Sequence, residues 1–463
     1  MTFDYDLAII GGGSAGYAAA HTAVADGLRT VVIESRLEVG GLCILRGCMP
    51  TKSLFYAAEV MQHARNVGLW GIHAENVGFD FAKVMAHKNA FIADLAEDRR
   101  AQLTSGKFQF IRGQARFLDP HTVAVDDHEP LTAGHFVIAT GSSVAPPHLS
   151  QLSEAGYLTS DDVLRLTHLP ESLIILGGGP VAVEFAQFFA RFGVRVTLLQ
   201  RSEHILSNFD TDAAMEIERI FRRDGIEIIT ATELTDAQSD GRRKTVSFLH
   251  HGQPGAVSAS DILLAIGRKS NIESLDLEMA GVAIEHGRIP ANEFMQTSIP
   301  HIYTAGDCTG PHEVVHLAVQ QGTNAAHNIA HPDNPRRLDE RLLLAVIFTE
   351  PQVAVVGLTE KAATTRGIPY LTAGHPFSEL GKSLIMGATD GYVKLLADPQ
   401  SGEILGGACI GPYGGELIHE IVAAMVKHMT VHELADMPHY HPTLAEIWAY
   451  PAESLADQIP RTM

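Results

Sequence analysis

The fold of this chain is decided by the stretch Asp6–Gly16, which reads DLAIIGGGSAG. The apolar run Asp6–Ile10 predicts a buried parallel strand, and an alanine-rich helix is expected to follow the glycines as far as Ala25. A second strand, Thr30–Ile33, is expected to end in Glu34. Strand, glycine turn, helix, strand and acid together form a complete βαβ fingerprint for a dinucleotide.

Each residue of this fingerprint has its own expected task. Gly11 makes the turn, Gly13 lets a pyrophosphate approach the backbone, and Gly16 lets the helix pack on the strand. The pyrophosphate is expected on the helix N-terminus, and Glu34 is expected to accept a hydrogen bond from a ribose hydroxyl. A glycine-rich turn without a ligand is the alternative, but the spacing of strand, helix and acid favours a bound nucleotide.

The same pattern returns in the middle of the chain. The strand Leu173–Leu176 precedes GGGPVA (Gly177–Ala182), a helix is expected to about Phe192, and the strand Val194–Leu199 ends in Gln200-Arg201. Gly11 and Glu34 are 23 positions apart, and so are Gly177 and Gln200. Two such folds imply two nucleotides, and a flavin dinucleotide with a nicotinamide dinucleotide is the simplest pair.

A third stretch, GGLCILRGCMPTK (Gly40–Lys52), carries two of the four cysteines. Pro50 is expected to be the first residue of a helix that runs to Arg65, so Cys48 lies at a helix N-terminus, where a thiolate is favoured. In a regular helix, Cα atoms five positions apart are about 8.6 Å from each other. A disulfide between Cys43 and Cys48 requires their Cα atoms to be no more than about 7 Å apart.

The segment must therefore leave helical geometry before a disulfide can close, and Gly47 is the residue expected to permit this. A reversible, reactive dithiol is the favoured hypothesis. Buried structural cysteines, or half of a zinc site, are the alternatives, although the remaining Cys308 and Cys409 are isolated from each other.

Length and composition limit the classes of protein. A chain of 463 residues should divide into about three domains, and 46% apolar with 19% charged residues describes a globular protein. The formal charge of −20 argues against nucleic acid or an anionic membrane as a partner. Because Tyr5–Ile10 is already a strand, no targeting signal is expected at the start, and four cysteines suit a reducing cytoplasm.

The other expected elements follow the hydrophobic pattern. Strands are expected at Phe108–Ile111, Thr122–Val125, His135–Ala139, Asp261–Ile266, Ile302–Thr304, Leu343–Phe348, Val353–Val356 and Val393–Ala397. Helices are expected up to Leu103 and over His312–Ile329, Glu360–Arg366 and Gly415–Lys427. A small-residue turn at Gly113–Phe117 is expected to let the backbone approach a ligand, and Pro146-Pro147 and Pro332–Pro335 suggest linkers.

Near the C-terminal end stands the cluster His439-Tyr440-His441-Pro442-Thr443-Leu444-Ala445-Glu446. With 24 histidines in the chain, a close pair by chance or an incidental surface feature is one interpretation. The other is catalytic, because thiol exchange needs a base near neutral pH, and a histidine oriented by a carboxylate supplies one.

The chain resembles the flavin-containing pyridine nucleotide-disulfide oxidoreductases over nearly its whole length. The motifs that carry the resemblance are both glycine fingerprints, the C-x4-C-x-P-[ST]-K segment, Ala139-Thr140-Gly141, Ala265-Ile266-Gly267-Arg268, Thr304-Ala305-Gly306-Asp307, Phe348-Thr349-Glu350-Pro351 and His441-Pro442-Thr443-x-x-Glu446.

This resemblance implies an α/β fold with two Rossmann-like dinucleotide-binding domains, for FAD and NAD(P), and a C-terminal α+β dimerisation domain. The expected boundaries are residues 1–147 with 270–335 for FAD, 148–269 for NAD(P) and 340–463 for the interface. FAD would contact Gly11, Gly13, Gly16, Glu34, Lys52, Ala115, Thr140, Gly141 and Asp307. NAD(P) would contact Gly177, Gly179, Ala182, Gln200, Arg201 and Gly267.

The resemblance also implies the catalytic roles. Electrons would pass from the nicotinamide through FAD to a Cys43–Cys48 disulfide, with Cys48 facing the flavin and Cys43 exchanging with the substrate. Lys52 would lie near the flavin and pair with Glu184. His441, oriented by Glu446, would move the proton and come from the partner subunit of a homodimer with shared active sites. No metal site is expected.

The resemblance favours a dihydrolipoamide dehydrogenase-like activity, with a glutathione-type small-disulfide reductase as the alternative. A mercuric reductase is disfavoured because the chain ends Pro460–Met463 without a cysteine pair and keeps His441. A flavoprotein oxidase or electron carrier that leaves the disulfide unused, and a non-catalytic subunit, are other classes. Leu45-Arg46 replaces the family's common Asn-Val and leaves the substrate open.

The second fingerprint favours NADPH over NADH. The acid that would repel a 2′-phosphate is replaced by the neutral Gln200, and the following Arg201 can pair with a phosphate. Glu203 tempers the local positive charge, and the alternative is that Arg201 points into solvent.

Overall fold

The computed structural model describes residues 2–461, which divide into two compact units. The first unit comprises the described residues up to Ser53, together with Ala82–Pro146 and Gly267–Leu338. The second comprises Leu54–Phe81, Pro147–Ile266 and the described residues from Asp339 onward. Within residues 2–461, no helix is both long and apolar enough to cross a lipid bilayer.

The first unit is built on a seven-stranded sheet. Its parallel strands are β1 (Tyr5–Ile10), β2 (Thr30–Glu34), β3 (Gln109–Arg112), β6 (Leu131–Ile138) and β16 (Ile302–Thr304). The antiparallel strands β4 (Ala115–Asp119) and β5 (Thr122–Val125) extend it beyond β6. β1 lies at the centre, where Ile9 pairs with Val32 on one side and Val137 on the other and is fully buried.

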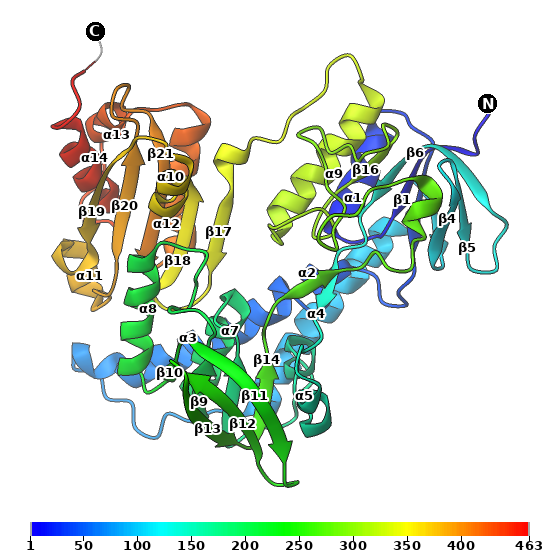
Figure 1. Cartoon of the computed structure of the whole chain (residues 1–463). Coiled ribbons are helices and arrows are strands. Elements are labelled where there is room, and N and C mark those ends of the chain that lie inside the picture. The colour runs from blue at the N-terminus through cyan, green and yellow to red at the C-terminus, as the bar shows by residue number, and fades with distance from the viewer. Residues whose placement is uncertain (1, 462–463) are drawn as a thin grey trace. The chain divides into compact units, whose positions relative to one another are not determined.

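Five helices lie wholly or mainly in the first unit or begin in it, and the first three of them begin at the glycine and cysteine motifs. They are α1 (Ser14–Ala25), α2 (Gly41–Leu45), α3 (Cys48–Asn66, which continues into the second unit), α4 (Phe81–Leu103, whose first residue lies in the second unit) and α9 (Val315–Ala330). A short antiparallel pair, β7 (Ser142–Val144) with β15 (Arg268–Ser270), and the 3₁₀ turn η2 (Leu277–Ala280) complete the unit. α1 and α9 lie side by side (Figure 1).

The second unit contains a parallel sheet that repeats the topology around β1. Its strands are β8 (Ser172–Leu176), β9 (Arg195–Leu199), β10 (Glu227–Ile229) and β14 (Asp261–Leu264). The strands β11 (Thr232–Ser239), β12 (Lys244–His250) and β13 (Gln253–Ala259) form a separate antiparallel sheet. The helices of this part are α5 (Ser150–Ala155), α6 (Ser160–Val163), α7 (Pro180–Arg191) and α8 (Thr211–Arg223).

The C-terminal part of this unit is a five-stranded antiparallel sheet in the order β17-β18-β21-β20-β19, with helices packed on it (Figure 1). The strands are β17 (Leu344–Ile347), β18 (Gln352–Gly357), β19 (Leu371–Pro376), β20 (Tyr392–Ala397) and β21 (Ile404–Gly411). The helices are α10 (Glu360–Arg366), α11 (Gly381–Met386), α12 (Gly414–Val426), α13 (Val431–Asp436) and α14 (Ala449–Ala456), with 3₁₀ turns at Glu340–Leu342, Phe377–Glu379 and Ala445–Trp448. Trp448 and Phe377 are fully buried in its core. Another 3₁₀ turn, Val67–Trp70, follows α3.

The predicted fold class is confirmed: two parallel nucleotide-binding sheets precede a C-terminal α+β segment. Pro50 is the third residue of its helix rather than the first, because α3 already begins at Cys48. The predicted turn at Gly113–Phe117 is wrong beyond Gln114, since Ala115 already begins β4. The boundaries proposed for three domains stay a prediction.

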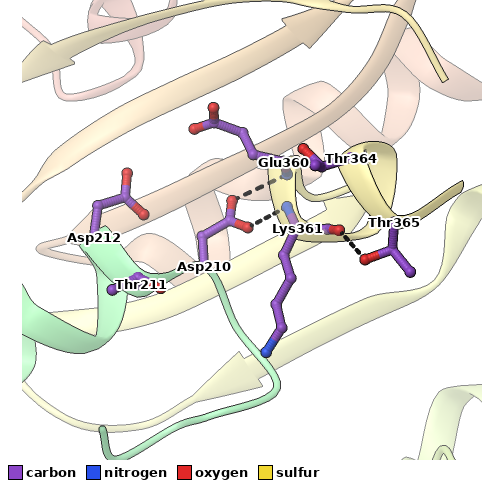
Figure 2. Close-up of a pocket in the computed structure, with 7 residues that line it drawn as sticks. All are labelled: Asp210, Thr211, Asp212, Glu360, Lys361, Thr364 and Thr365. Atoms are coloured by element: carbon purple, nitrogen blue, oxygen red, sulfur yellow. Dashed lines mark hydrogen bonds between the residues drawn. The ribbon is translucent and has the colours of Figure 1, made fainter. Parts of the chain in front are cut away.

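A cluster of ion pairs joins α8 to the C-terminal sheet. Lys394 on β20 is almost fully buried, and its Nζ lies 3.0 Å from Asp210, 2.8 Å from Asp212 and 2.7 Å from Glu360. The Asp210 carboxylate also accepts from the backbone N–H groups of Glu360 and Lys361, which begin α10 (Figure 2). Burial alone would lower the pKa of Lys394, but the three carboxylates raise it. The open pocket drawn in Figure 2 contains none of the predicted site residues.

We expect Lys394→Met to destabilise the protein by about 3–5 kcal/mol, because removing one partner leaves buried Asp210 without its cation. The midpoint of urea unfolding, followed by circular dichroism, measures the loss. Lys269→Met is the matched control, since the exposed Lys269–Glu273 pair is worth about 0–1 kcal/mol. Equal midpoints for the two variants would contradict this account.

Candidate redox and dinucleotide site

The cysteine segment leaves helical geometry between its two sulfurs. α2 ends at Leu45, Arg46 has non-helical dihedrals with φ −145° and ψ 3°, and α3 begins at Cys48. A Cβ on Gly47 would lie 3.0 Å from the Leu42 carbonyl oxygen and 3.3 Å from the Cys43 Cα. Gly47 is not among the residues with positive φ. It is therefore needed for close packing on the Cys43 turn, and not for the conformational freedom that the sequence suggested.

The two thiols are half-buried and hydrogen-bonded to each other. The hydrogen bond to Cys48 raises the pKa of the Cys43 thiol, burial raises it further, and nearby Lys52 only partly opposes this. Cys43 in the reduced pair therefore holds its proton at neutral pH. A base must remove that proton before Cys43 can attack a disulfide, because the thiolate is the nucleophile.

The first glycine fingerprint has the geometry that FAD requires. Gly11 has φ +110°, and a Cβ there would lie 2.3 Å from the Ala139 carbonyl oxygen. A Cβ on Gly16 would lie 1.8 Å from the Gly11 carbonyl oxygen, so α1 packs closer than any side chain allows. Gly13 caps α1 without a side-chain hydrogen bond, which leaves the N-terminal amides to a phosphate. Buried Glu34 accepts from the Gly12 amide at 2.9 Å, which fixes its carboxylate beside the fingerprint.

A second group of predicted FAD residues gathers where β6 and β16 end. Within residues 2–461 the hydroxyl of Thr140 is buried without a hydrogen-bond partner, as expected of an atom that binds a ligand. Gly141 follows with φ +69°. Asp307 accepts from the Ser142 hydroxyl at 2.6 Å, and that hydroxyl accepts from Arg268 Nε at 2.7 Å. These residues fit FAD, although Ala115 lies in β4 and not in a turn.

The second fingerprint repeats the first closely. Gly177 has φ +114°, and a Cβ there would lie 2.3 Å from the Ala265 carbonyl oxygen, the same distance as at Gly11. Gly179 caps α7 without a side-chain hydrogen bond. Ala182 takes the place of the third glycine and is fully buried, so α7 has room for one methyl group. Gln200, directly after β9, has its side chain against Gly178, and this fold fits NAD(P). Gly267, with φ +121°, belongs to the first unit, and its contact with NAD(P) stays a prediction.

Glu184 is buried on α7, where its carboxylate accepts from the Phe348 amide at 2.8 Å. One turn later, Gln187 exchanges two hydrogen bonds with the backbone of Glu350, at 2.8 and 2.7 Å. These contacts hold the Phe348–Pro351 motif against α7. Lys52 belongs to the first unit and Glu184 to the second, and their pairing stays a prediction.

The two histidines of the cluster, His439 and His441, have different hydrogen-bond partners and different roles. His439 uses both ring nitrogens, towards Glu420 at 2.7 Å and the Met437 carbonyl at 3.1 Å. Among the described residues, His441 forms a hydrogen bond through Nδ1 alone, at 2.9 Å from Glu446, and 75% of its side chain is exposed. Glu446 is buried. The carboxylate thus orients the ring and leaves Nε2 facing outward for proton transfer.

Sequence reasoning missed three residues that position the others: Ser142, Arg268 and Gln187. Arg268 was visible as the end of the Ala265–Arg268 motif, but its contact with Ser142 spans more than a hundred positions. Near the cysteines, Arg46 lies 3.4 Å from exposed Glu38, and the Arg99 guanidinium lies 3.9 Å above the Tyr17 ring. Burial lowers the pKa of the Arg99 guanidinium, and the nearby Tyr17 and Cys43 act against this shift. Arg99 is thus a second cation, besides Arg46, near the cysteine segment.

Known proteins resemble this chain over nearly its whole length. Residues 5–322 match the family model described as "Pyridine nucleotide-disulphide oxidoreductase", and residues 344–451 match its dimerisation domain. The chain is 35% identical to dihydrolipoyl dehydrogenase of Bacillus subtilis over 96% of this chain and 97% of that protein. It is 33% identical to mercuric reductase of Staphylococcus aureus, over 96% and 81% of the two chains.

Among solved structures, the HOCl-induced flavoprotein disulfide reductase RclA from Escherichia coli superposes with a TM-score of 0.86 at 27% identity. The alignment covers 97% of this chain and 99% of that one. Both nucleotide folds, the cysteine segment and the C-terminal sheet are therefore shared with established flavoprotein enzymes, for which FAD and NAD(P) are the typical cofactors. The chain belongs to the pyridine nucleotide-disulphide oxidoreductase family, as a flavoprotein oxidoreductase with that family's dimerisation domain.

Proposed function

We propose that this enzyme exchanges electrons between NAD(P)H and a dihydrolipoyl-type dithiol and its disulfide, through the Cys43–Cys48 pair. The observation that carries the proposal is the raised pKa of Cys43 together with the outward-facing His441 imidazole. A thiol that holds its proton needs a base, and the chain contains an imidazole braced by a buried carboxylate.

In the proposed reaction, FAD, His441, Cys43 and Cys48 each have a separate role. FAD, when bound, supplies the two-electron link between the nicotinamide and the cysteines. In the reducing direction His441 takes the proton of Cys43, and the thiolate attacks the substrate disulfide, forming a mixed disulfide and releasing one substrate thiolate. His441 returns the proton to that thiolate. Cys48 then attacks Cys43 Sγ as a thiolate, which closes the internal disulfide, breaks the mixed disulfide and releases the second substrate sulfur as a thiolate, and this thiolate takes up the proton that Cys48 has lost.

The dihydrolipoyl group is favoured because the B. subtilis relative, named dihydrolipoyl dehydrogenase, aligns over nearly its full length. A glutathione-type disulfide is the alternative. Mercuric reductases are relatives of similar identity. The only cysteines besides the redox pair, Cys308 and Cys409, are fully buried, which disfavours them as ligands for incoming mercury.

Steady-state assays of the purified flavoprotein test the substrate. We expect turnover of dihydrolipoamide with NAD(P)⁺, and of lipoamide with NAD(P)H, to exceed turnover of glutathione disulfide and of Hg²⁺. Faster turnover of glutathione disulfide would replace this proposal with the alternative. Flavin that is reduced by NAD(P)H but passes no electrons to any disulfide would favour an oxidase or electron carrier.

We further propose that NADPH is preferred over NADH. Gln200 accepts from the Arg201 amide at 3.1 Å and is neutral, so the end of β9 carries no charge that repels a 2′-phosphate. Arg201 is exposed and, within residues 2–461, forms no ion pair with Glu203 or another carboxylate.

The expected result is a higher kcat/KM for NADPH than for NADH, and a loss of that preference of roughly tenfold or more in Arg201→Ala, because a charge-assisted phosphate contact is worth about 1.5–3 kcal/mol. Arg195→Ala, which removes an exposed arginine at the start of β9, is the control. A wild-type preference for NADH would show that the interpretation of Arg201 is wrong.

The dimerisation domain supports a homodimer. We propose that the active sites are shared, with His441 serving the cysteines of the partner subunit. The cytoplasmic location expected from charge and cysteine content stays a prediction.

A further inference from the structure

Three side chains with metal-ligand chemistry meet at the ends of two helices, outside the dinucleotide and redox residues. They are Asp26, His327 and His331, and one ligand atom of each lies within 4.8 Å of the others. We propose that they form a binding site for a divalent transition-metal ion of the zinc type, with two imidazole nitrogens and one carboxylate oxygen as ligands.

The sequence brings the two histidines together because they lie four positions apart, His327 in the last turn of α9 and His331 as the residue that caps its C-terminus. Their ring centroids are 4.6 Å apart. Asp26 caps the C-terminus of α1. α1 and α9 pack side by side, and a Cβ on Gly322 would lie 2.2 Å from the Ala15 carbonyl oxygen. This close contact lies near the start of α1 and in the middle of α9, and the two helices bring their C-terminal ends together at Asp26 and His331.

The electrostatics of this corner favour a cation. The C-terminus of a helix carries a partial negative charge, and two such termini converge here on one carboxylate. Within residues 2–461 the only ion-pair partner of Asp26 is His331, with Nε2 at 3.4 Å from Oδ1. No lysine or arginine of the described residues forms an ion pair with Asp26, so a bound cation would meet no competing basic side chain at this carboxylate.

The contacts of His327 also prepare it as a ligand. Its Nε2 lies 3.2 Å from the Asn334 carbonyl oxygen, to which it donates as N–H. The hydrogen bond leaves the lone pair on Nδ1, and such an outer contact fixes the tautomer and orientation of metal-binding histidines. His327 is buried while His331 is 46% exposed, so the site is anchored on one side and open to solution on the other.

A set of two imidazoles and one carboxylate suits Zn²⁺, with water in the remaining position. It does not suit Ca²⁺ or Mg²⁺, which prefer oxygen ligands alone. The site lies at the far end of α1 from the phosphate-binding glycines, about 18 Å away for a helix of 12 residues. A bound ion would therefore tie α1 to α9 and stabilise the FAD-binding fold without taking part in electron transfer.

A second acid–histidine group, Glu59, His63 and Glu350, fits a metal less well. It offers one imidazole only, and Glu350 already pairs with Arg191 at 2.5 Å. This cluster provides the matched control for the first.

Zinc titration of the oxidised, FAD-loaded enzyme tests the proposal, because a closed disulfide removes the Cys43 and Cys48 thiolates as competing ligands. After dialysis against a chelator, calorimetry with ZnCl₂ is expected to show one saturable site per chain, and Zn²⁺ is expected to raise the thermal midpoint. His331→Ala and Asp26→Asn change side chains at the mouth of the site. Each should weaken binding by about 10–100-fold or more, since even outer-shell losses cost that much, and abolish the thermal shift. His63→Ala should change neither.

Absence of saturable Zn²⁺ binding in the wild type would overturn the proposal. So would wild-type affinity in both His331→Ala and Asp26→Asn, or loss of binding in His63→Ala alone, which would assign the ion to the other cluster. Circular dichroism and flavin absorbance of each variant confirm that a lost site is not a lost fold.

Discussion

Replacing either Cys43 or Cys48 by serine is expected to reduce disulfide turnover to background while FAD stays bound. The cofactor residues and the sulfurs are separate: the fingerprint glycines and Glu34 hold their geometry through backbone contacts in which neither sulfur takes part. Exchange needs both sulfurs, because one attacks the substrate and the other resolves the mixed disulfide. Flavin absorbance, NADPH-dependent flavin reduction and steady-state turnover measure binding and the two half-reactions separately.

Cys308→Ser is the matched control. Cys308 is fully buried and its Sγ contacts the Ile138 and Ala305 carbonyl oxygens at 3.4 Å, so a hydroxyl can replace it as a donor. This variant should keep disulfide turnover. Substantial turnover in Cys43→Ser or Cys48→Ser would exclude the role given to the pair, and loss of flavin from these variants would show that the segment also holds the cofactor.

The two nucleotide folds were predictable because their determinants are local. The turn at Gly11 and the turn at Gly177 each need a residue without a Cβ, since a Cβ would meet the carbonyl of Ala139 or Ala265 at 2.3 Å. These glycine requirements recur at a fixed spacing, and the alternation of strands and helices around them predicts the βαβ fold. The same locality made Glu360–Arg366 correct to the residue.

The features that escaped prediction depend on contacts that the residue pattern does not display. The strands β11–β13 form a small antiparallel sheet whose residues alternate only weakly between buried and exposed. Gly47 was identified for the wrong reason, because what it must avoid is the Leu42 and Cys43 backbone, a packing contact that sequence does not display. Lys394 reads as an ordinary strand lysine until Asp210 and Asp212, some 180 positions earlier, are seen beside it.

The site residues show the same difference between contacts that the sequence pattern reveals and contacts that it does not. His441 and Glu446 are five positions apart, so their contact was inferable, and the structure adds that Glu446 is buried and His441 exposed. The chain of contacts from Arg268 through Ser142 to Asp307 was not inferable, because it joins three separate segments around one hydroxyl. Contacts between residues close in sequence can be inferred from their spacing, whereas contacts that join separate segments can be identified only in the folded structure.

His441→Ala is expected to slow disulfide turnover by roughly 10²–10⁴-fold, the usual contribution of a positioned base, and to leave flavin reduction by NADPH nearly intact. The hydrogen bond to Cys48 and burial raise the pKa of Cys43, so without a base only the small thiolate fraction reacts. Turnover of the variant should therefore rise with increasing pH, where the wild type is already at its plateau. Equal losses in both half-reactions would instead indicate a structural role.

Mixing subunits decides whether that base comes from the partner. If sites are shared, a dimer of one His441→Ala chain and one Cys43→Ser chain has one site with both intact groups and one with neither. Equal amounts of the two inactive variants, dissociated and reassociated at random, should then recover about a quarter of the wild-type activity, because half of the dimers are mixed and each has one working site of two. Each variant reassociated with itself is the control. No recovery, with mixed dimers verified by differently tagged chains, would place His441 and Cys43 of one active site on the same subunit.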